Sequence, residues 1–210
     1  MTGGSGFMGR RLSVELLKRG HTVRALVRPG SERKLAAGVA PVIGDALDKA
    51  SYAAAVAPAD TLVHLVGVSH PNPSKAEEFR QIDAKSAMNA IAAAVDAHIG
   101  HFVYLSVAQP APVMQAYIEV RAECERALRA SGLNATVLRP WYVLGPGRRW
   151  PLLLVPMYWV LRLIPTTRES EARLGLVTLE QMVAALVGAV ENPAAGVRVV
   201  GVPEIRASKI

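Results

Sequence analysis

Apolar residues recur along the chain at two spacings, which alternate from one segment to the next. Continuous apolar runs at 60–68 and 101–107 are typical of strands buried on both faces of a sheet. Segments with apolar residues every three or four positions, such as 115–132 and 178–193, are typical of amphipathic helices. Because parallel strands are joined by crossovers that are usually helical, this alternation predicts one α/β domain over residues 1–210, with a doubly wound parallel sheet and flanking helices.

The same pattern sets approximate bounds for each element. Ser74 and Glu77 have the spacing of a capping box, so the longest helix is expected to begin at Ser74. The predicted strands are 21–28, 40–48, 60–68, 101–107, 134–147 and 196–203, and the predicted helices are 6–20, 49–57, 74–98, 115–132 and 178–193.

A glycine-rich turn, TGGSGFMG, opens the first helix. Gly3, Gly6 and Gly9 follow the pattern GxxGxxG, and Gly4, Gly6 and Gly9 also fit GxGxxG. A turn without side chains lets a pyrophosphate approach the backbone, and the following helix N-terminus offers N–H groups and a positive dipole end. The turn therefore predicts a Rossmann-like fold that binds a dinucleotide.

A strand normally precedes such a turn, yet only Met1 and Thr2 stand before Gly3. In a Rossmann-like sheet this first strand lies in the middle, so its loss would leave two neighbouring strands without partners for their N–H and C=O groups. We expect the first strand to be missing or truncated in this sequence, with about five to eight further residues upstream, the length of a typical strand.

The end of the next strand bears on the choice of cofactor. Arg28 ends the strand 21–28, and Arg33 and Lys34 follow shortly after it. A carboxylate at this point would bind the ribose 2′-hydroxyl of NAD, whereas an arginine accommodates the 2′-phosphate of NADP. The sequence therefore favours NADP(H) over NAD(H).

Composition narrows the class of protein further. The net charge is +7, but the basic residues are scattered and no nucleic-acid-binding motif is present, so no nucleic-acid partner is predicted. The five histidines and the single cysteine lack the spacing of a metal site, so no metal is predicted either. The most apolar stretch, 150–165, is shorter than the ~20 residues of a membrane span, and we expect a cytoplasmic protein. This stretch could be a core helix, a substrate lid or a patch that contacts a membrane or a protein.

In their order along the chain, these motifs resemble the atypical or extended short-chain dehydrogenase/reductase family of epimerase/dehydratase-like, NAD(P)-binding proteins. The matching segments are TGGSGFMG, GDALD, HLVG, VYLSV, YIEVR in the place of YxxxK, and LRPWYVLGPG. The resemblance implies an oxidoreductase that moves a hydride between NADP(H) and a carbonyl or hydroxyl group of a small-molecule substrate. It also implies a short substrate or lid region around 145–176, and a monomer or homodimer.

The resemblance assigns roles to single residues. Tyr117 would exchange a proton with the substrate oxygen, Ser106 would orient that oxygen, and Arg121 would replace the family's lysine. The residues assigned to cofactor binding are Thr2, Gly3, Gly6, Phe7, Met8, Gly9, Arg28, Asp45, Ala46, Val66, Gly67, Val68 and Pro140.

Tyr117 and Arg121 lie four residues apart, so both should project from one helical face. A neighbouring cation favours the phenolate, which leads us to expect a lowered pKa for Tyr117. An arginine cannot relay a proton at accessible pH, however, so this departure from the family pattern leaves catalysis open. The rival hypotheses are a non-catalytic dinucleotide-binding regulator, a respiratory-complex accessory or assembly protein, and a membrane-peripheral enzyme for a lipophilic substrate.

The structure should distinguish these hypotheses. An enzyme predicts that the Tyr117 hydroxyl lies within hydrogen-bond reach of Ser106, beside an open cavity. A regulator predicts that this cavity is filled, for example by Trp141 or Met114. A membrane-peripheral enzyme predicts that the apolar side chains of 150–165 lie exposed.

Overall fold

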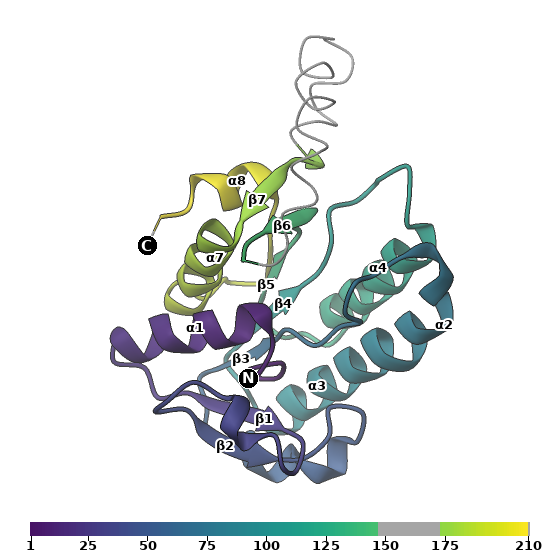
Figure 1. The fold of residues 1–210 in the computed structure, drawn as a ribbon. Coiled ribbons are helices and arrows are strands. Elements are labelled where there is room, and N and C mark those ends of the chain that lie inside the picture. The colour runs from purple at the N-terminus through teal and green to yellow at the C-terminus, as the bar shows by residue number, and fades with distance from the viewer. Residues whose placement is uncertain (147–172, 210) are drawn as a thin grey trace.

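The structure is a computed structural model that describes residues 1–146 and 173–209. Parallel strands form its centre, and helices cover both faces of the sheet (Figure 1). α1 (Phe7–Lys18) and α7 (Leu179–Glu191) pack together on one face, whereas α3 (Lys85–Asp96) and α4 (Gln115–Ala130) pack together on the other. The doubly wound α/β architecture predicted from the sequence is confirmed.

All strand pairs among the described residues are parallel. β3, β4, β5 and β8 form a four-stranded sheet in that order, β1 pairs with β2, and β6 pairs with β7. The bounds are β1 (Arg24–Val27), β2 (Ala40–Ile43), β3 (Thr61–His64), β4 (His101–Leu105), β5 (Ala135–Leu138), β6 (Tyr142–Leu144), β7 (Leu176–Thr178) and β8 (Val197–Val200).

Met1 and Thr2 join the β1–β2 pair to the four-stranded sheet. The Thr2 N–H donates to the Val63 carbonyl at 2.9 Å, and the Leu26 N–H donates to the Met1 carbonyl at 2.8 Å. The link to β3 is one isolated parallel bridge, between Thr2 and His64. The first strand, which the sequence predicted to be missing or truncated, is thus represented by these two residues.

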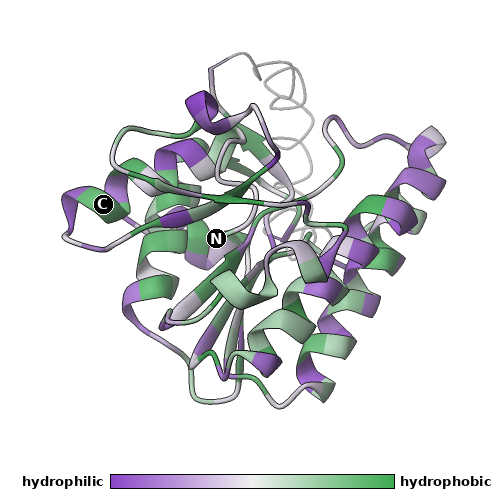
Figure 2. Cartoon of the chain, turned by 90° about the horizontal axis from the view of Figure 1, so that it is seen from below, coloured by the Kyte–Doolittle hydropathy of each residue, from purple (hydrophilic) through white to green (hydrophobic). Residues whose placement is uncertain are grey.

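Two apolar cores lie on the two faces of the sheet. One contains Leu12 of α1 with Met182 and Leu186 of α7, and the other contains Ala90 of α3 with Leu128 of α4. All five side chains are fully buried. Hydrophobic strands lie between the helices, whose hydrophilic residues are on their outer sides (Figure 2).

The helix predicted at 74–98 begins differently. Asn72, not Ser74, caps it: the Asn72 side chain accepts the Ser74 N–H in front of a 3₁₀ turn, Pro73–Lys75. Proline at the first helical position makes the residue before it extended, and that is the backbone conformation of an N-cap. α2 (Ala76–Glu78) and a π-helical turn, Phe79–Ala84, then lead into α3.

Three other elements differ from the prediction. Residues 49–57 form two 3₁₀ turns, Lys49–Ser51 and Ala53–Ala55, and the following proline disfavours the helical conformation at the residue before it. The apolar pattern does not predict the short strand β7 or the final helix α8 (Val202–Ala207).

Some expectations fall on parts of the chain outside the described residues. These are the alternatives for 150–165 and most of the lid region expected around 145–176. Within 1–146 and 173–209, no helix is long and apolar enough to cross a membrane, and no three potential metal ligands cluster together.

Candidate functional site

The glycine-rich turn begins where Met1 and Thr2 end, between β1 and β3. Gly3 has a φ of +75°, and a Cβ there would lie 2.9 Å from the backbone carbon of Leu65. The Gly3 carbonyl accepts the Gly6 N–H at 3.0 Å, and a Cβ on Gly9 would collide with that carbonyl. Glycine is therefore required at both Gly3 and Gly9. α1 begins at Phe7 without a side-chain cap from Gly6, so its N-terminus can receive a phosphate.

Thr2 holds the turn on β3. Its hydroxyl forms a 2.8 Å hydrogen bond with Nδ1 of His64, and both residues are buried. Burial, together with the charges of Arg121 and the Met1 amino group, lowers the pKa of His64 to about 3. The imidazole is therefore neutral at physiological pH, and Thr2 supports the predicted phosphate-binding turn from within the protein.

The other residues predicted to bind the cofactor follow the carboxyl ends of strands. Arg28 follows β1, Asp45 and Ala46 follow β2, Val66–Val68 follow β3, and Pro140 follows β5. The carboxyl ends of parallel strands share one edge of the sheet, where ligands of such sheets bind.

Arg28 and Asp45 differ in how they are held at this edge. Arg28 is exposed, and its side chain makes no hydrogen bond or ion pair with any described residue, so its guanidinium is available to a ligand. The Asp45 carboxylate instead accepts the Leu47 N–H at 2.9 Å and stabilises its own turn.

Tyr117 and Arg121 of α4 lie together, as their spacing predicted. The Arg121 guanidinium carbon lies 5.2 Å from the centre of the Tyr117 ring. Arg121 is only 3% exposed, and its Nη1 donates to the Leu105 carbonyl at 2.8 Å and to the Tyr104 hydroxyl at 3.3 Å. The guanidinium is thus committed to the protein interior, beneath the tyrosine ring.

Asp83 is a site residue that the sequence analysis missed. Its Oδ1 accepts a 2.5 Å hydrogen bond from Nη2 of Arg121, and its Oδ2 accepts the Val68 N–H at 2.9 Å. Asp83 therefore connects Arg121 to the segment predicted to pass along the cofactor. The sequence did contain a signal for Asp83. It lies four residues after Phe79 and four before Ala87, and this spacing places its side chain on the buried face of the helix.

Gly67 leaves the space in which this ion pair forms. A Cβ at Gly67 would collide with Nη2 of Arg121 and lie 3.1 Å from Oδ1 of Asp83. A side chain at this position would therefore push the two charged groups apart.

The pKa expected for Tyr117 is corrected by the structure. Burial raises the pKa of the phenol, and the opposing effect of the Arg121 charge does not overcome it. The Asp83 carboxylate adds to the increase, because it neutralises much of the guanidinium charge that was expected to favour the phenolate. Tyr117 is therefore protonated at neutral pH.

Ser106 follows β4, at the predicted edge of the sheet, but its hydroxyl is directed elsewhere. Its Oγ donates to Oε1 of Glu125 at 2.6 Å, and no hydrogen bond joins Ser106 to Tyr117 among the described residues. Arg139 binds both carboxylate oxygens of Glu125, at 2.9 and 2.5 Å. The structure therefore brings Tyr117 and Arg121 together, while Ser106 belongs to a second buried network around Glu125.

Apolar side chains also adjoin Tyr117. Val107, Ala111 and Ile118 form a buried cluster, against which Tyr117 and Trp141 pack. Trp141, which the regulator hypothesis expects to fill the cavity, thus packs on the same cluster as Tyr117. Met114 instead has a left-handed conformation, with a φ of 62°, immediately before α4.

A family model described as NAD(P)H-binding matches residues 3–148. The chain belongs to the NAD(P)H-binding family. The match includes the glycine-rich turn, Asp83, Tyr117 and Arg121. The predicted membership of an NAD(P)-binding family of oxidoreductases is confirmed, whereas the preference for NADP(H) stays a prediction.

Two curated relatives are reductases. The chain is 30% identical, over 69% of its length, to the 4-hydroxy-2-methyl-3-oxo-4-farnesyl-3,4-dihydroquinoline-1-oxide ketoreductase of Stigmatella aurantiaca. It is 31% identical, over 83% of its length, to the 2-alkyl-3-oxoalkanoate reductase of Stenotrophomonas maltophilia. It spans 50% and 57% of the lengths of these two proteins, respectively.

A solved structure shares the fold. A short-chain dehydrogenase/reductase superfamily protein from Agrobacterium tumefaciens with bound NAD superposes with a TM-score of 0.69 at 18% identity. The superposition covers 95% of this chain and 76% of the other. The predicted Rossmann-like fold is therefore confirmed.

Proposed function

We propose that the chain binds NADP(H) in preference to NAD(H) and reduces the carbonyl group of a small-molecule substrate. The observation that carries the cofactor preference is Arg28: it lies immediately after β1 and is exposed, and its side chain has no hydrogen-bond or ion-pair partner among the described residues. A free guanidinium at this point suits the 2′-phosphate of NADP, and no carboxylate takes its place to bind a 2′-hydroxyl.

Tyr117 is the proton donor in this proposal. NADPH, when bound, supplies a hydride to the carbonyl carbon. The Tyr117 hydroxyl gives its proton to the carbonyl oxygen, and the raised pKa of the phenol keeps that proton in place at neutral pH. Arg121 holds the tyrosine ring but cannot return the proton, so Tyr117 regains it from solvent.

The substrate we favour is a ketone attached to an apolar chain. Tyr117 packs against the apolar cluster of Val107, Ala111 and Ile118, so the surroundings of the proton donor suit such a chain. The names of the two curated relatives support this class of substrate. The compound in one name has a farnesyl group next to the ketone, and the compound in the other has an alkyl group there.

Fluorescence titration with NADPH and NADH tests the cofactor assignment. Arg28→Asp should weaken NADPH binding about tenfold or more, the effect of losing a charge-assisted hydrogen bond, and should leave NADH binding nearly unchanged. Arg126→Asp is the matched control, because Arg126 is an exposed arginine on α4. Equal affinity for both nucleotides, with no selective effect of Arg28→Asp, would show that the preference is wrong.

A non-catalytic dinucleotide-binding regulator is the second candidate. The contact between Ser106 and Glu125 favours it, as does the packing of Trp141 on the apolar cluster against which Tyr117 also packs. A series of alkyl and isoprenyl ketones, followed by NADPH oxidation, decides between the two. Tight NADPH binding without turnover of any ketone would support the regulator.

A further inference from the structure

The buried network around Glu125 connects three parts of the chain. Glu125 lies on α4, and its side chain is only 1% exposed. Its carboxylate accepts hydrogen bonds from four side chains, which are Ser106 (2.6 Å), Gln109 (2.8 Å), Arg129 (3.2 Å) and Arg139 (2.5 and 2.9 Å). Arg129 belongs to the same helix, whereas the other three donors come from the segments that follow β4 and β5. One carboxylate thus joins both segments to α4.

Glu125 is ionised in this network although it is buried. Burial disfavours a carboxylate, but the hydrogen bonds from Arg139 and Ser106 outweigh burial and hold the pKa of Glu125 below its ordinary value. Arg139 binds both carboxylate oxygens, a bidentate geometry that adds strength and directional specificity. The segment after β5 is therefore held firmly to α4.

The two segments that Glu125 holds also pair with each other. The Ser106 N–H donates to the Leu138 carbonyl at 2.8 Å, and the Ala108 N–H donates to the Pro140 carbonyl at 2.9 Å. The parallel pairing of β4 with β5 thus continues beyond both strands. The bonds to Glu125 add α4 to this pairing as a third element at a fixed distance.

The elements that Glu125 joins also carry the apolar cluster on which Tyr117 packs. The members of the cluster, and the tryptophan packed against it, come from the segment after β4 (Val107, Ala111), from α4 (Ile118) and from the segment after β5 (Trp141). The position of the Tyr117 ring therefore depends on how these elements are held together.

Glu125 itself lies away from the Tyr117 hydroxyl. It comes eight residues later on α4, a rise of about 12 Å. Ile118 comes seven residues before Glu125, close to two full helical turns, so these two side chains share one face of the helix. Glu125 can thus act on the site only through the elements that it holds.

We propose that Glu125 is a positioning residue for Tyr117. Its carboxylate fixes the segments after β4 and β5 against α4, and thereby sets the apolar support that holds the phenol at the reacting carbonyl. This role rests on the proposed function, in which Tyr117 donates the proton. A misplacement of about 1 Å can slow a reaction about 100-fold, so loss of this support should lower kcat even at a distance.

Glu125→Gln tests this role. The amide keeps the size of the side chain but turns one acceptor into a donor, so the bidentate pair with Arg139 is lost. Hydrogen exchange at the Ser106 and Ala108 amides should become faster. The kcat for ketone reduction should fall about tenfold or more, while the Kd of NADPH stays nearly unchanged.

Arg139→Lys is a milder second variant, in case Glu125→Gln does not fold. Lysine keeps the positive charge but cannot bind both carboxylate oxygens. This variant should therefore change the same amide exchange rates and kcat in the same direction.

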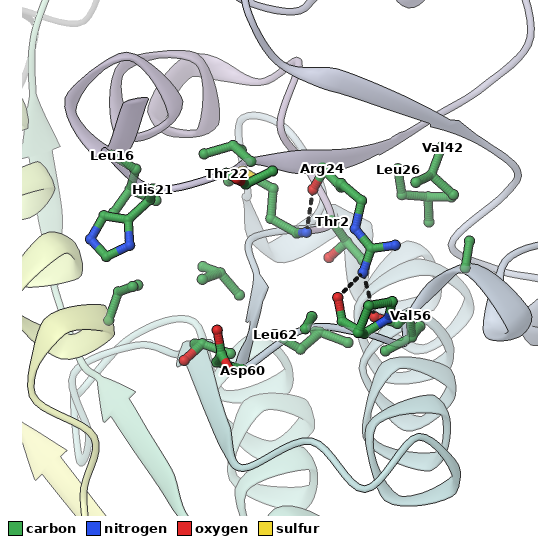
Figure 3. A pocket seen from close by; sticks show the side chains of 18 of the residues that line it. Thr2, Leu16, His21, Thr22, Arg24, Leu26, Val42, Val56, Asp60 and Leu62 are labelled. Carbon is green, nitrogen blue, oxygen red and sulfur yellow. Dashed lines mark hydrogen bonds between the residues drawn. The ribbon is translucent and has the colours of Figure 1, made fainter. Parts of the chain in front are cut away.

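Arg24→Lys is the matched control for a purely structural loss. Arg24 begins β1 and donates to the carbonyls of residues 56–58 at 2.6–3.3 Å, beside a groove between β1 and β3 (Figure 3). It is an arginine cross-link, as Arg139 is, but it lies at the amino end of its strand and not at the edge that Tyr117 adjoins. Arg24→Lys should lower Tm and leave kcat unchanged at temperatures where the protein stays folded.

A double-mutant cycle distinguishes positioning of Tyr117 from a general loss of active protein. In a Tyr117→Phe background no phenol remains to be positioned, so Glu125→Gln should not lower the residual rate further. Equal fold-losses in the two backgrounds would overturn this role, as would unchanged exchange at the Ser106 and Ala108 amides in Glu125→Gln. Full activity in Tyr117→Phe, or no ketone turnover by the unaltered protein, would instead overturn the proposed function and this role with it.

Discussion

Asp83 and Arg121 form a buried ion pair between the π-helical turn and α4, with 2.5 Å between Oδ1 and Nη2. The side chains are 0% and 4% exposed, so each charge is balanced almost entirely by the other. Burial is the main cause of the raised pKa of Tyr117, and Asp83 adds to it by offsetting part of the effect of the guanidinium beneath the ring. The phenol is consequently suited to donate a proton at neutral pH.

Asp83→Asn should destabilise the protein strongly. The substitution leaves the Arg121 charge buried without its anionic partner, which costs about 3–5 kcal/mol of unfolding free energy. Urea unfolding measures the loss. Asp96→Asn is the matched control, since Asp96 pairs with Lys49 on the surface and should cost less than about 1 kcal/mol. Equal losses in the two variants would mean that the buried pair has no special role in stability.

Tyr117→Phe should remove ketone reduction while leaving cofactor binding intact. Loss of a general acid costs about 100-fold or more in kcat, and the ring that packs against Phe79 and Arg121 is retained. Steady-state kinetics and NADPH titration measure the two effects. Tyr52→Phe is the control, because it also removes a buried tyrosine hydroxyl. Tyr52 packs with Leu26 and Ala93 in a separate apolar cluster. Comparable activity in both variants would contradict the role of Tyr117.

The raised pKa of Tyr117 predicts opposite pH dependences for the two directions of reaction. Reduction requires the protonated phenol, so its rate should be constant through neutral pH and fall as the pH rises toward the raised pKa. Alcohol oxidation requires the phenolate, so its rate should increase over the same range. Rate profiles between about pH 6 and 10 test this prediction. An oxidation rate that is already maximal at pH 7 would show that the phenol pKa is lowered.

Ser106→Ala distinguishes a structural role of this hydroxyl from a role in orienting the substrate. Because Ser106 binds the buried Glu125 carboxylate, the substitution should cost about 1.5–3 kcal/mol of stability and change kcat less than tenfold. Ser208→Ala is the control, since its hydroxyl bonds to a carbonyl at the surface. If kcat instead falls about 100-fold with stability unchanged, Ser106 orients the substrate.

The order of strands and helices could be predicted from the sequence because apolar spacing follows burial directly. The helix at 74–98 shows the limit: Ser74 and Glu77 fit a capping box, but the proline at 73 moved the cap to Asn72. β7, with three residues, is too short to give a spacing signal.

Site residues could be predicted from the sequence where the backbone leaves space for only one residue type. The protonation state of a site residue could not be predicted where it depends on a partner far away along the sequence. Gly3 and Gly9 follow from the turn itself. The pKa of Tyr117 depends mainly on burial, and also on Asp83, which is 34 residues away along the sequence and reaches α4 only through the fold. Ser106 likewise bonds to Glu125, 19 residues later, and no local pattern indicates that contact.

The narrow connection through Met1 and Thr2 bears on how the molecule unfolds. Although only two residues connect them, the β1–β2 pair and the four-stranded sheet share one apolar core, which contains Ala25 of β1, Val63 of β3 and Leu186 of α7, so they should unfold in one step. A dinucleotide held between Arg28 on one unit and Val66–Val68 on the other would act as a non-covalent cross-link. Saturation with cofactor should therefore raise the midpoint of this single calorimetric transition while the fold stays the same.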